Sequence, residues 1–261
     1  MTLEEQLEQM RRDWDRRARE NARNSVNTER ADWTDQEFFA TGELVVDEEI
    51  LSDPVNVYQS KDPACMRVLE IGCGAGRVTR ALSNLFGEVH AVDVSGEMVA
   101  NARSALHDRS NATVYQNNGY DLKVLPALIF DFAFSSHVFQ HIPSHEIIES
   151  YVREVHRLLR PGALFKFQVQ GNRFEDRPPD TWHGVSFTQE QATAMAQRCG
   201  FEHRYSFGEG NHYFWLWFFK LPTSAREHTR LARLTCTLYS HGEKNRSAGF
   251  FGRGHGDDSP R

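Results

Sequence analysis

The sequence predicts an α/β protein built on a mostly parallel, doubly wound sheet with helices on both faces. From residue 67 onward, short apolar strand patterns alternate with helical patterns, and strands joined through helices form right-handed βαβ units. The stretch FDFAFSS at 130–136 is apolar almost throughout, which is typical of a strand covered on both faces. Together these two observations favour a sheet buried between two layers of helices.

The N-terminal part is expected to be helical. Residues 3–24 contain good helix formers without glycine or proline, and their apolar residues recur at three- and four-residue steps. These apolar residues are Leu3, Leu7, Met10 and Trp14. The acidic segment 28–59 includes FFATGEL, which suggests a second helix that ends at Gly42.

The alternating part supplies the elements of the sheet in order. Strands are expected at 67–72, 89–95, 112–117, 130–136 and 163–169, with two closing strands at 202–208 and 212–220. Helices are expected at 77–86, 96–107, 144–160 and 188–201. Pro161 and Gly162 would stop the third of these helices, and Thr188 with Gln191 forms a capping box for the fourth.

Length and composition limit the possible classes. A chain of 261 residues favours one domain with additions, here an N-terminal helical cap or lid over 1–60, a core over 61–221, and a C-terminal helix with a flexible tail over 222–261. No run reaches the roughly 18 apolar residues of a membrane span, and the charged N-terminus lacks a signal-peptide centre. Four cysteines without CxxC spacing and a net charge of −6 favour a cytoplasmic protein with reduced thiols and no broad nucleic-acid binding.

The loop after the first strand, VLEIGCGAGRVTRAL from residue 68, should bring its backbone close to a ligand. Glycines occupy positions 72, 74 and 76, and the following helix offers free N–H groups. A dinucleotide-binding loop needs G-x-G-x-x-G, but Arg77 and Thr79 stand where the third glycine would fall. A phosphate-binding loop needs a lysine that this loop lacks.

The spacing that does match is E-x-G-x-G-x-G from Glu70 to Gly76, followed by Asp93 at the end of the second strand. With YQNNGYDL, FDFAFSSHVFQHI and LLRPGALFKF, these segments make residues 61–220 resemble the class I S-adenosylmethionine-dependent methyltransferases. The resemblance implies a seven-stranded, Rossmann-like sheet whose last strand is antiparallel, with 212–220 placed to be that strand. It implies S-adenosylmethionine as the cofactor and methyl transfer as the activity.

The resemblance also places the donor. Glu70 suits its ammonium group, and Asp93 suits both ribose hydroxyls through charge-assisted hydrogen bonds. Asn118 and Gly119 match the positions that read the adenine, and Ser135 and Ser136 border the sulfonium and the methyl group. The full set of expected cofactor-binding residues is Glu70, Gly72, Cys73, Gly74, Gly76, Asp93, Val94, Met98, Asn118, Gly119 and Ser135.

The acceptor should sit just after the fourth strand. There His141 is the candidate general base or wall of the acceptor site. His137 and His145 flank it at four-residue steps, but Pro143 breaks the helical register, so no metal site is expected. The expected substrate-binding residues are Trp14, His137, His141 and Arg173.

Two motifs narrow the acceptor. The D/N/S-P-P-Y/F motif of enzymes that methylate nucleic-acid amino groups is replaced by SSHVF, and the Pro-Cys pair of cytosine C5 enzymes is missing. With the acidic net charge, this favours a small-molecule acceptor over nucleic acid. Two alternatives remain open: a non-catalytic relative that binds a partner, and a NAD-type oxidoreductase, which the glycine spacing disfavours.

Overall fold

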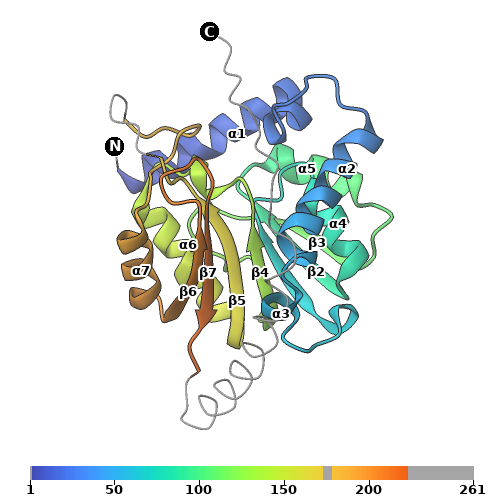
Figure 1. The fold of residues 1–261 in the computed structure, drawn as a ribbon. Coiled ribbons are helices and arrows are strands. Elements are labelled where there is room, and N and C mark those ends of the chain that lie inside the picture. Colours follow the sequence, from blue (N-terminus) through green and yellow to red (C-terminus); the bar gives the residue numbers. More distant parts are fainter. Residues whose placement is uncertain (1, 173–177, 223–261) are drawn as a thin grey trace, which may run out of the picture. The chain divides into compact units, whose positions relative to one another are not determined.

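A computed structural model describes residues 2–172 and 178–222. The contacts within the chain divide it into two units, 1–221 and 222–261, and the fold described here is that of the first (Figure 1). The expected C-terminal helix and tail therefore lie outside the described residues, apart from Pro222. Within the described part, no helix is both long and apolar enough to cross a bilayer.

Seven strands form one sheet in the order β3-β2-β1-β4-β5-β7-β6. Strands β1 to β5 pair in parallel, whereas β7 is antiparallel to both β5 and β6. The predicted seven-stranded sheet with one antiparallel strand at 212–220 is thus confirmed. The strands are β1 (Arg67–Ile71), β2 (Glu88–Asp93), β3 (Ala112–Gln116), β4 (Phe130–Ser135), β5 (Leu159–Val169), β6 (Phe201–Phe207) and β7 (Phe214–Lys220).

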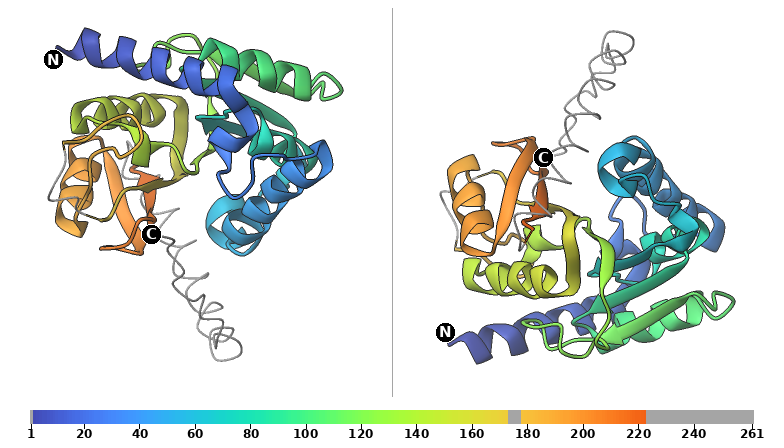
Figure 2. Two further views of the ribbon diagram at one scale, coloured as in Figure 1. Left: turned by 90° about the horizontal axis from the view of Figure 1, so that it is seen from above. Right: turned by 90° about the horizontal axis from the view of Figure 1, so that it is seen from below.

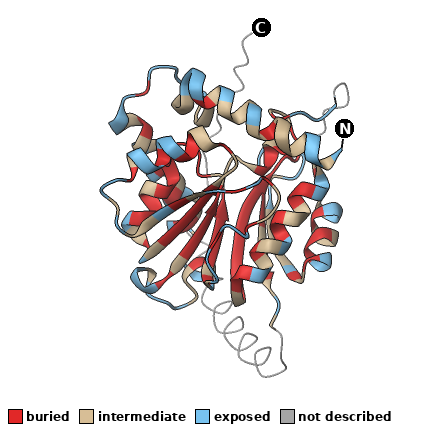
Figure 3. Ribbon diagram, turned by 180° about the vertical axis from the view of Figure 1, so that it is seen from behind, coloured by how far each residue is buried: buried red, intermediate tan, exposed pale blue. Residues whose placement is uncertain are grey.

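Helices cover both faces of the sheet, and the strands between them are buried along most of their length (Figure 3). On one face α6 and α7 pack on Leu69, Phe165 and Phe167. On the other, α2 and α4 pack on Val68 and Phe132, and α5 packs beside them on Ala91. The helices and helical turns are α1 (Leu3–Val26), α2 (Asp35–Val46), η1 (Asp47–Leu51), α3 (Pro54–Tyr58), η2 (Pro63–Cys65), α4 (Arg77–Leu85), α5 (Gly96–Ala105), η3 (Phe139–His141), α6 (His145–Leu158) and α7 (Gln189–Arg198).

The predicted end of a helix at Gly42 is wrong. Helix α2 begins at the Thr34 capping box and continues through Gly42 to Val46. Gly42 is needed for packing instead, because a Cβ atom there would lie 2.2 Å from the backbone oxygen of Arg77. The glycine therefore lets α2 lie directly on the first turn of α4.

The helix expected at 144–160 is also shorter than predicted. It ends at Leu158, and Leu159 already has the extended backbone of a strand (φ −78°, ψ 147°). Strand β5 accordingly begins before Pro161 and Gly162 and contains both of them.

Helix α1 crosses above the carboxyl ends of the parallel strands (Figure 2). Its regular backbone is interrupted at Asn21 (ψ 95°). After that break the last residues of α1 reach the glycine loop, because Val26 lies 2.7 Å from where a Cβ of Gly74 would be. Helix α1 therefore ends beside the glycine loop at this edge of the sheet.

Candidate active site

A pocket opens at the carboxyl ends of β1, β2 and β4, where the strand order reverses on either side of β1. Open α/β sheets bind their ligands at such a point. The hollow, including the open solvent at its mouth, measures about 860 Å³. Its lining residues are Met10, Trp14, Ser25, Val26, Glu70, Ile71, Gly72, Cys73, Gly74, Arg77, Val78, Val92, Asp93, Val94, Met98, Asn117, Ser136, His137, Val138, His141, Ile142 and Tyr151.

The glycine loop forms the floor of the pocket. Gly72 and Gly74 have φ of 76° and 51°, values that L side chains rarely adopt. A Cβ at Gly72 would lie 2.2 Å from a methyl carbon of Val138. Gly76, also at positive φ, begins α4 and packs against Ala102, so it shapes the loop from behind without lining the pocket.

Two carboxylates lie on either side of this loop. The Oδ2 atom of Asp93 accepts the N–H of Gly74 and the Oδ1 atom accepts that of Ser95, both at 2.9 Å. Burial raises the pKa of Asp93 to about 6, against these two hydrogen bonds. Glu70 accepts the hydroxyl of Thr79 at 2.6 Å, and burial raises its pKa to about 7. Both groups are therefore poised to ionise near neutral pH, as in many ligand sites.

Most of the predicted site residues meet in this pocket. From the cofactor set, Glu70, Gly72, Cys73, Gly74, Asp93, Val94 and Met98 line it, and so do Trp14, His137 and His141 from the substrate set. Arg173 lies outside the described residues. Gly76, Asn118, Gly119 and Ser135 do not line the pocket.

In two places the neighbouring residue lines the pocket instead. The Ser135 hydroxyl donates to the carbonyl of Ile71 between adjacent strands (2.9 Å), and Ser136 lines the pocket. Asn118 is exposed, and its Oδ1 accepts hydrogen bonds from the backbone N–H groups of Tyr120 and Asp121. Asn117 is buried in the lining, and in the described part of the chain its Oδ1 has no hydrogen-bond partner.

Other lining residues were not predicted, and most of them come from outside the glycine loop. Met10, Ser25 and Val26 belong to α1, and Tyr151 belongs to α6, where its hydroxyl accepts a hydrogen bond from Asn117 (2.7 Å). The sequence signalled Met10 and Tyr151 only as apolar positions of helices. No local pattern indicates that these helix faces turn towards a pocket.

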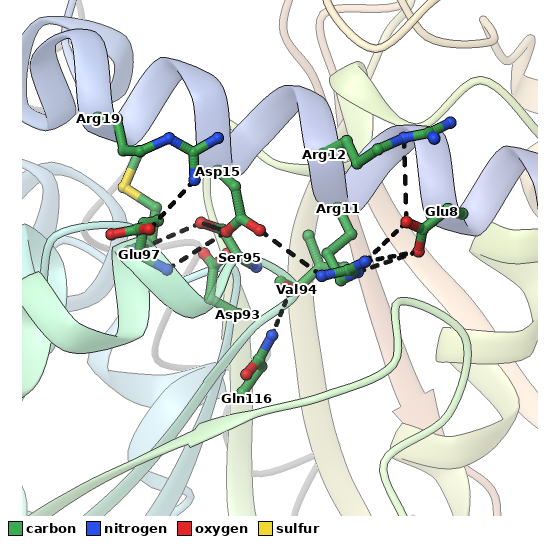
Figure 4. A network of polar contacts seen from close by, with 11 residues as sticks. Glu8, Arg11, Arg12, Asp15, Arg19, Asp93, Val94, Ser95, Glu97 and Gln116 are labelled. Atoms are coloured by element: carbon green, nitrogen blue, oxygen red, sulfur yellow. Dashed lines mark hydrogen bonds and ion pairs between the residues drawn. The ribbon is translucent and has the colours of Figure 1, made fainter.

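Polar contacts hold α1 over the loop that follows β2 (Figure 4). Asp15 accepts the hydroxyl of Ser95 at 2.6 Å and also the backbone N–H of Glu97. Arg19 forms an ion pair with Glu97 (3.1 Å). The same loop carries Asp93, so the position of the helix is tied to that of the carboxylate.

Aromatic rings gather at the other end of the pocket. The ring of Trp14 meets that of His141 edge to face at 5.3 Å, and Trp182 packs against both. The guanidinium of Arg17 lies over both indoles and donates to the Thr181 carbonyl (3.0 Å). Helix α1 and the segment after β5 therefore build this wall together.

His141 is held in one tautomer by a chain of four hydrogen bonds. The backbone N–H of His137 donates to Gln168 Oε1 (3.0 Å), and Gln168 Nε2 donates to Gln140 Oε1 (2.5 Å). Gln140 Nε2 then faces His141 Nε2 (3.2 Å), while His141 Nδ1 faces the Trp182 carbonyl (2.7 Å). A carbonyl can only accept, so the proton sits on Nδ1 and Nε2 accepts from Gln140. Burial also lowers the pKa of His141 to about 4, so its imidazole is neutral.

The fold and this site define a Rossmann-like domain of the class I methyltransferase type. Residues 69–167 match a family model described as a methyltransferase domain.

Known proteins agree with this assignment. A malonyl-[acyl-carrier protein] O-methyltransferase of Enterobacter lignolyticus is 33% identical over 101 residues, which cover 39% of this chain and 38% of that protein. A ubiquinone biosynthesis O-methyltransferase of Xanthomonas axonopodis is 30% identical over 103 residues, with 39% and 42% covered. The chain thus spans less than half the length of these curated relatives. The solved DhpI–SAH complex shares the fold, with a TM-score of 0.59, 19% identity, and 83% of this chain and 97% of that chain covered.

Proposed function

We propose that this protein is an S-adenosylmethionine-dependent methyltransferase (EC 2.1.1.-) that transfers a methyl group to a small-molecule acceptor by in-line displacement. The observation that carries the proposal is a pair of carboxylates, buried Glu70 and half-buried Asp93, on either side of a glycine loop at the point where the strand order reverses. A cationic nucleoside without phosphate needs such acceptors. The O-methyltransferase relatives support the same reaction class.

In this reading residues 1–60 form the cap and residues 61–221 the catalytic core. The donor carries an already activated methyl group, so the protein has mainly to align the acceptor and exclude water. Alignment of this kind can be worth roughly 7–11 kcal/mol. Helix α1, which supplies Met10 and Trp14 to the lining, would keep water out.

We assign His141 to the wall of the acceptor site rather than to a general base. Both of its ring nitrogens already have partners, Gln140 and the Trp182 carbonyl. Its pKa is also far below neutral, whereas an efficient base has a pKa near the working pH. The neutral ring and the indole of Trp14 would form an aromatic wall beside the acceptor, and Trp182 packs behind them.

Asp93 gives the direct test of the donor site. We expect Asp93→Ala to weaken the binding of S-adenosylhomocysteine more than tenfold in calorimetric titration, because it removes a charge-assisted acceptor for the ribose hydroxyls. Asp108→Ala is the matched control: Asp108 pairs with Arg80 at the protein surface, so its loss should leave the affinity within twofold of the wild type.

Three results would contradict the proposal. Equal affinities of Asp93→Ala and the wild type would overturn the ribose assignment. Binding of NAD but not of S-adenosylhomocysteine by the wild type would favour an oxidoreductase. Tight binding of S-adenosylhomocysteine, with no S-adenosylmethionine turnover across a broad acceptor panel, would leave a donor-binding protein without catalysis.

The affinity for the donor should also depend on pH. Because burial raises the pKa of Glu70 to about 7 and that of Asp93 to about 6, both carboxyls are largely protonated in the free protein at pH 5.5. Binding an ammonium and ribose hydroxyls favours the ionised forms, so binding releases protons and strengthens as pH rises. We expect S-adenosylhomocysteine to bind more than tenfold more tightly at pH 8 than at pH 5.5.

Calorimetric titrations at several pH values, in two buffers of different ionisation enthalpy, would measure both the affinity and the protons released. Glu70→Gln should remove the pH dependence of the affinity near pH 7 and leave the pH dependence near pH 6 unchanged. A wild-type affinity that stays constant from pH 5.5 to pH 8 would contradict the assignment of these carboxylates to the donor. Circular dichroism at each pH would show that the fold is intact.

A further inference from the structure

Arg77 is a buried cation whose hydrogen-bonding capacity is only partly used. It is the first residue of α4, lines the pocket and is 6% exposed. Its Nη1 donates to the carbonyl (2.9 Å) and the hydroxyl (3.2 Å) of Thr41, while its buried Nε has no hydrogen-bond partner among the residues that the structure describes. Buried charges and buried polar groups in folded proteins are normally paired, so this guanidinium is prepared for a partner.

No carboxylate within the described residues lies at ion-pair distance from Arg77. Glu70 and Glu29 act on its charge only from farther away, without a hydrogen bond. Glu70 also lines the pocket, and its own hydrogen bond goes to Thr79. The pocket therefore contains one buried cation and one buried carboxyl group that do not neutralise each other directly.

The position of Arg77 adds to its positive charge. Helix α4 has nine residues, and its first turn, behind Gly76, points its free N–H groups towards the loop. The charge of Arg77 is also one cause of the lowered pKa of nearby His137, after burial itself. The guanidinium and the helix N-terminus together favour an anion at this end of the pocket.

We infer that Arg77 binds a carboxylate in this pocket, namely that of the amino-acid end of the methyl donor, whose ammonium group is bound by Glu70. The inference rests on the proposed function. An α-amino acid carries both charges on one carbon, and a guanidinium and a carboxylate in the same pocket complement it. A guanidinium can also bind a carboxylate through two parallel hydrogen bonds. The other possible source of an anion is an acidic group on the acceptor.

Two ligands distinguish these sources. S-Adenosylhomocysteine has the amino-acid end, whereas 5′-methylthioadenosine has the same nucleoside and thioether without it. In calorimetric titrations of the full chain, Arg77→Gln should lower the affinity for S-adenosylhomocysteine more than tenfold. The affinity for 5′-methylthioadenosine should change by less than twofold. Arg77→Lys keeps the charge but loses the two parallel N–H donors of the guanidinium. It should lower the affinity for S-adenosylhomocysteine to an intermediate extent and leave that for 5′-methylthioadenosine unchanged.

Arg80→Gln is the matched control, because Arg80 lies one turn along α4 and pairs with Asp108 (2.8 Å). It should leave both affinities within twofold. Unchanged binding of both ligands by Arg77→Gln would overturn the inference and assign the cation to the acceptor. An equal loss of affinity for both ligands would overturn the inference in favour of a purely structural role of Arg77. If Arg77→Gln does not fold, Arg77→Lys is tested against the same outcomes. A wild type that binds 5′-methylthioadenosine and S-adenosylhomocysteine equally well refutes the inference but not the proposed function, whereas a wild type that binds neither refutes both.

Discussion

Replacing Gly72 with alanine is expected to lower the free energy of unfolding by about 2–5 kcal/mol and to weaken the binding of S-adenosylhomocysteine more than tenfold. Two costs add up. An alanine at φ 76° pays about 1–2 kcal/mol for a left-handed backbone. Its Cβ would also lie 2.2 Å from a methyl carbon of Val138, and overpacking of this kind costs about 1–3 kcal/mol. Since Gly72 and Val138 both line the pocket, any relief of the overlap moves the loop that we propose binds the donor.

The chain offers a matched control at Gly210, which has φ 78° but nothing within 4 Å of an added Cβ. Gly210→Ala should therefore lower the free energy of unfolding only through its left-handed backbone and should leave the affinity for the donor unchanged. Chemical denaturation of both variants separates the two terms, and Gly72→Ala with Val138→Ala should recover part of the loss. Equal destabilisation by Gly72→Ala and Gly210→Ala would show that Val138 does not crowd the loop.

Replacing Glu49 with alanine is expected to cost about 3 kcal/mol of stability. Glu49, in the turn η1 after α2, forms an ion pair at 2.8 Å with Lys166, whose side chain is 2% exposed. Lys166 lies in the middle of β5 and also faces the rings of Trp215 and Trp217. Removing one partner of a buried pair leaves the other charge uncompensated, which costs about 3–5 kcal/mol. The lower end is expected because the backbone carbonyl of Glu49 still accepts from Lys166.

Urea unfolding would measure this loss. The double variant Glu49→Ala with Lys166→Met should be more stable than Glu49→Ala, because it removes the orphaned charge and keeps an apolar side chain between the tryptophans. Glu48→Ala, at the exposed neighbouring position, is the control and should stay within about 0.5 kcal/mol of the wild type. A double variant less stable than Glu49→Ala would show that Lys166 stabilises this region without its ion pair.

Two kinds of feature could be predicted from the sequence. The strands and helices follow from the spacing of apolar residues within each segment, which is local. The glycine loop with Glu70 and Asp93 is also local, because the turn needs glycines at fixed positions and each carboxylate is one of the last two residues of a strand. Parallel strands end at one edge of the sheet, so the pocket lies where these residues indicated.

The remaining features depend on contacts between segments far apart in the chain. A glycine next to apolar residues indicated a helix end at Gly42, yet close packing on Arg77 keeps it inside α2. The choice of Asn117 over Asn118 as a lining residue depends on which side chain caps the local turn. The chain of hydrogen bonds to His141 needs two glutamines, one of them on β5. Each of these depends on the position of a distant segment, which one segment's pattern does not contain.

The sequence by itself thus determined the order of the elements and the glycine loop, because hydrophobic periodicity and glycine spacing act over a few residues. The antiparallel last strand followed from the resemblance to a known family. Only the tertiary structure decided that α1 covers this loop through Asp15, that Glu49 neutralises Lys166, and that Arg77 keeps a free donor beside the pocket. Those outcomes depend on burial, and burial removes the water that would otherwise satisfy each charge.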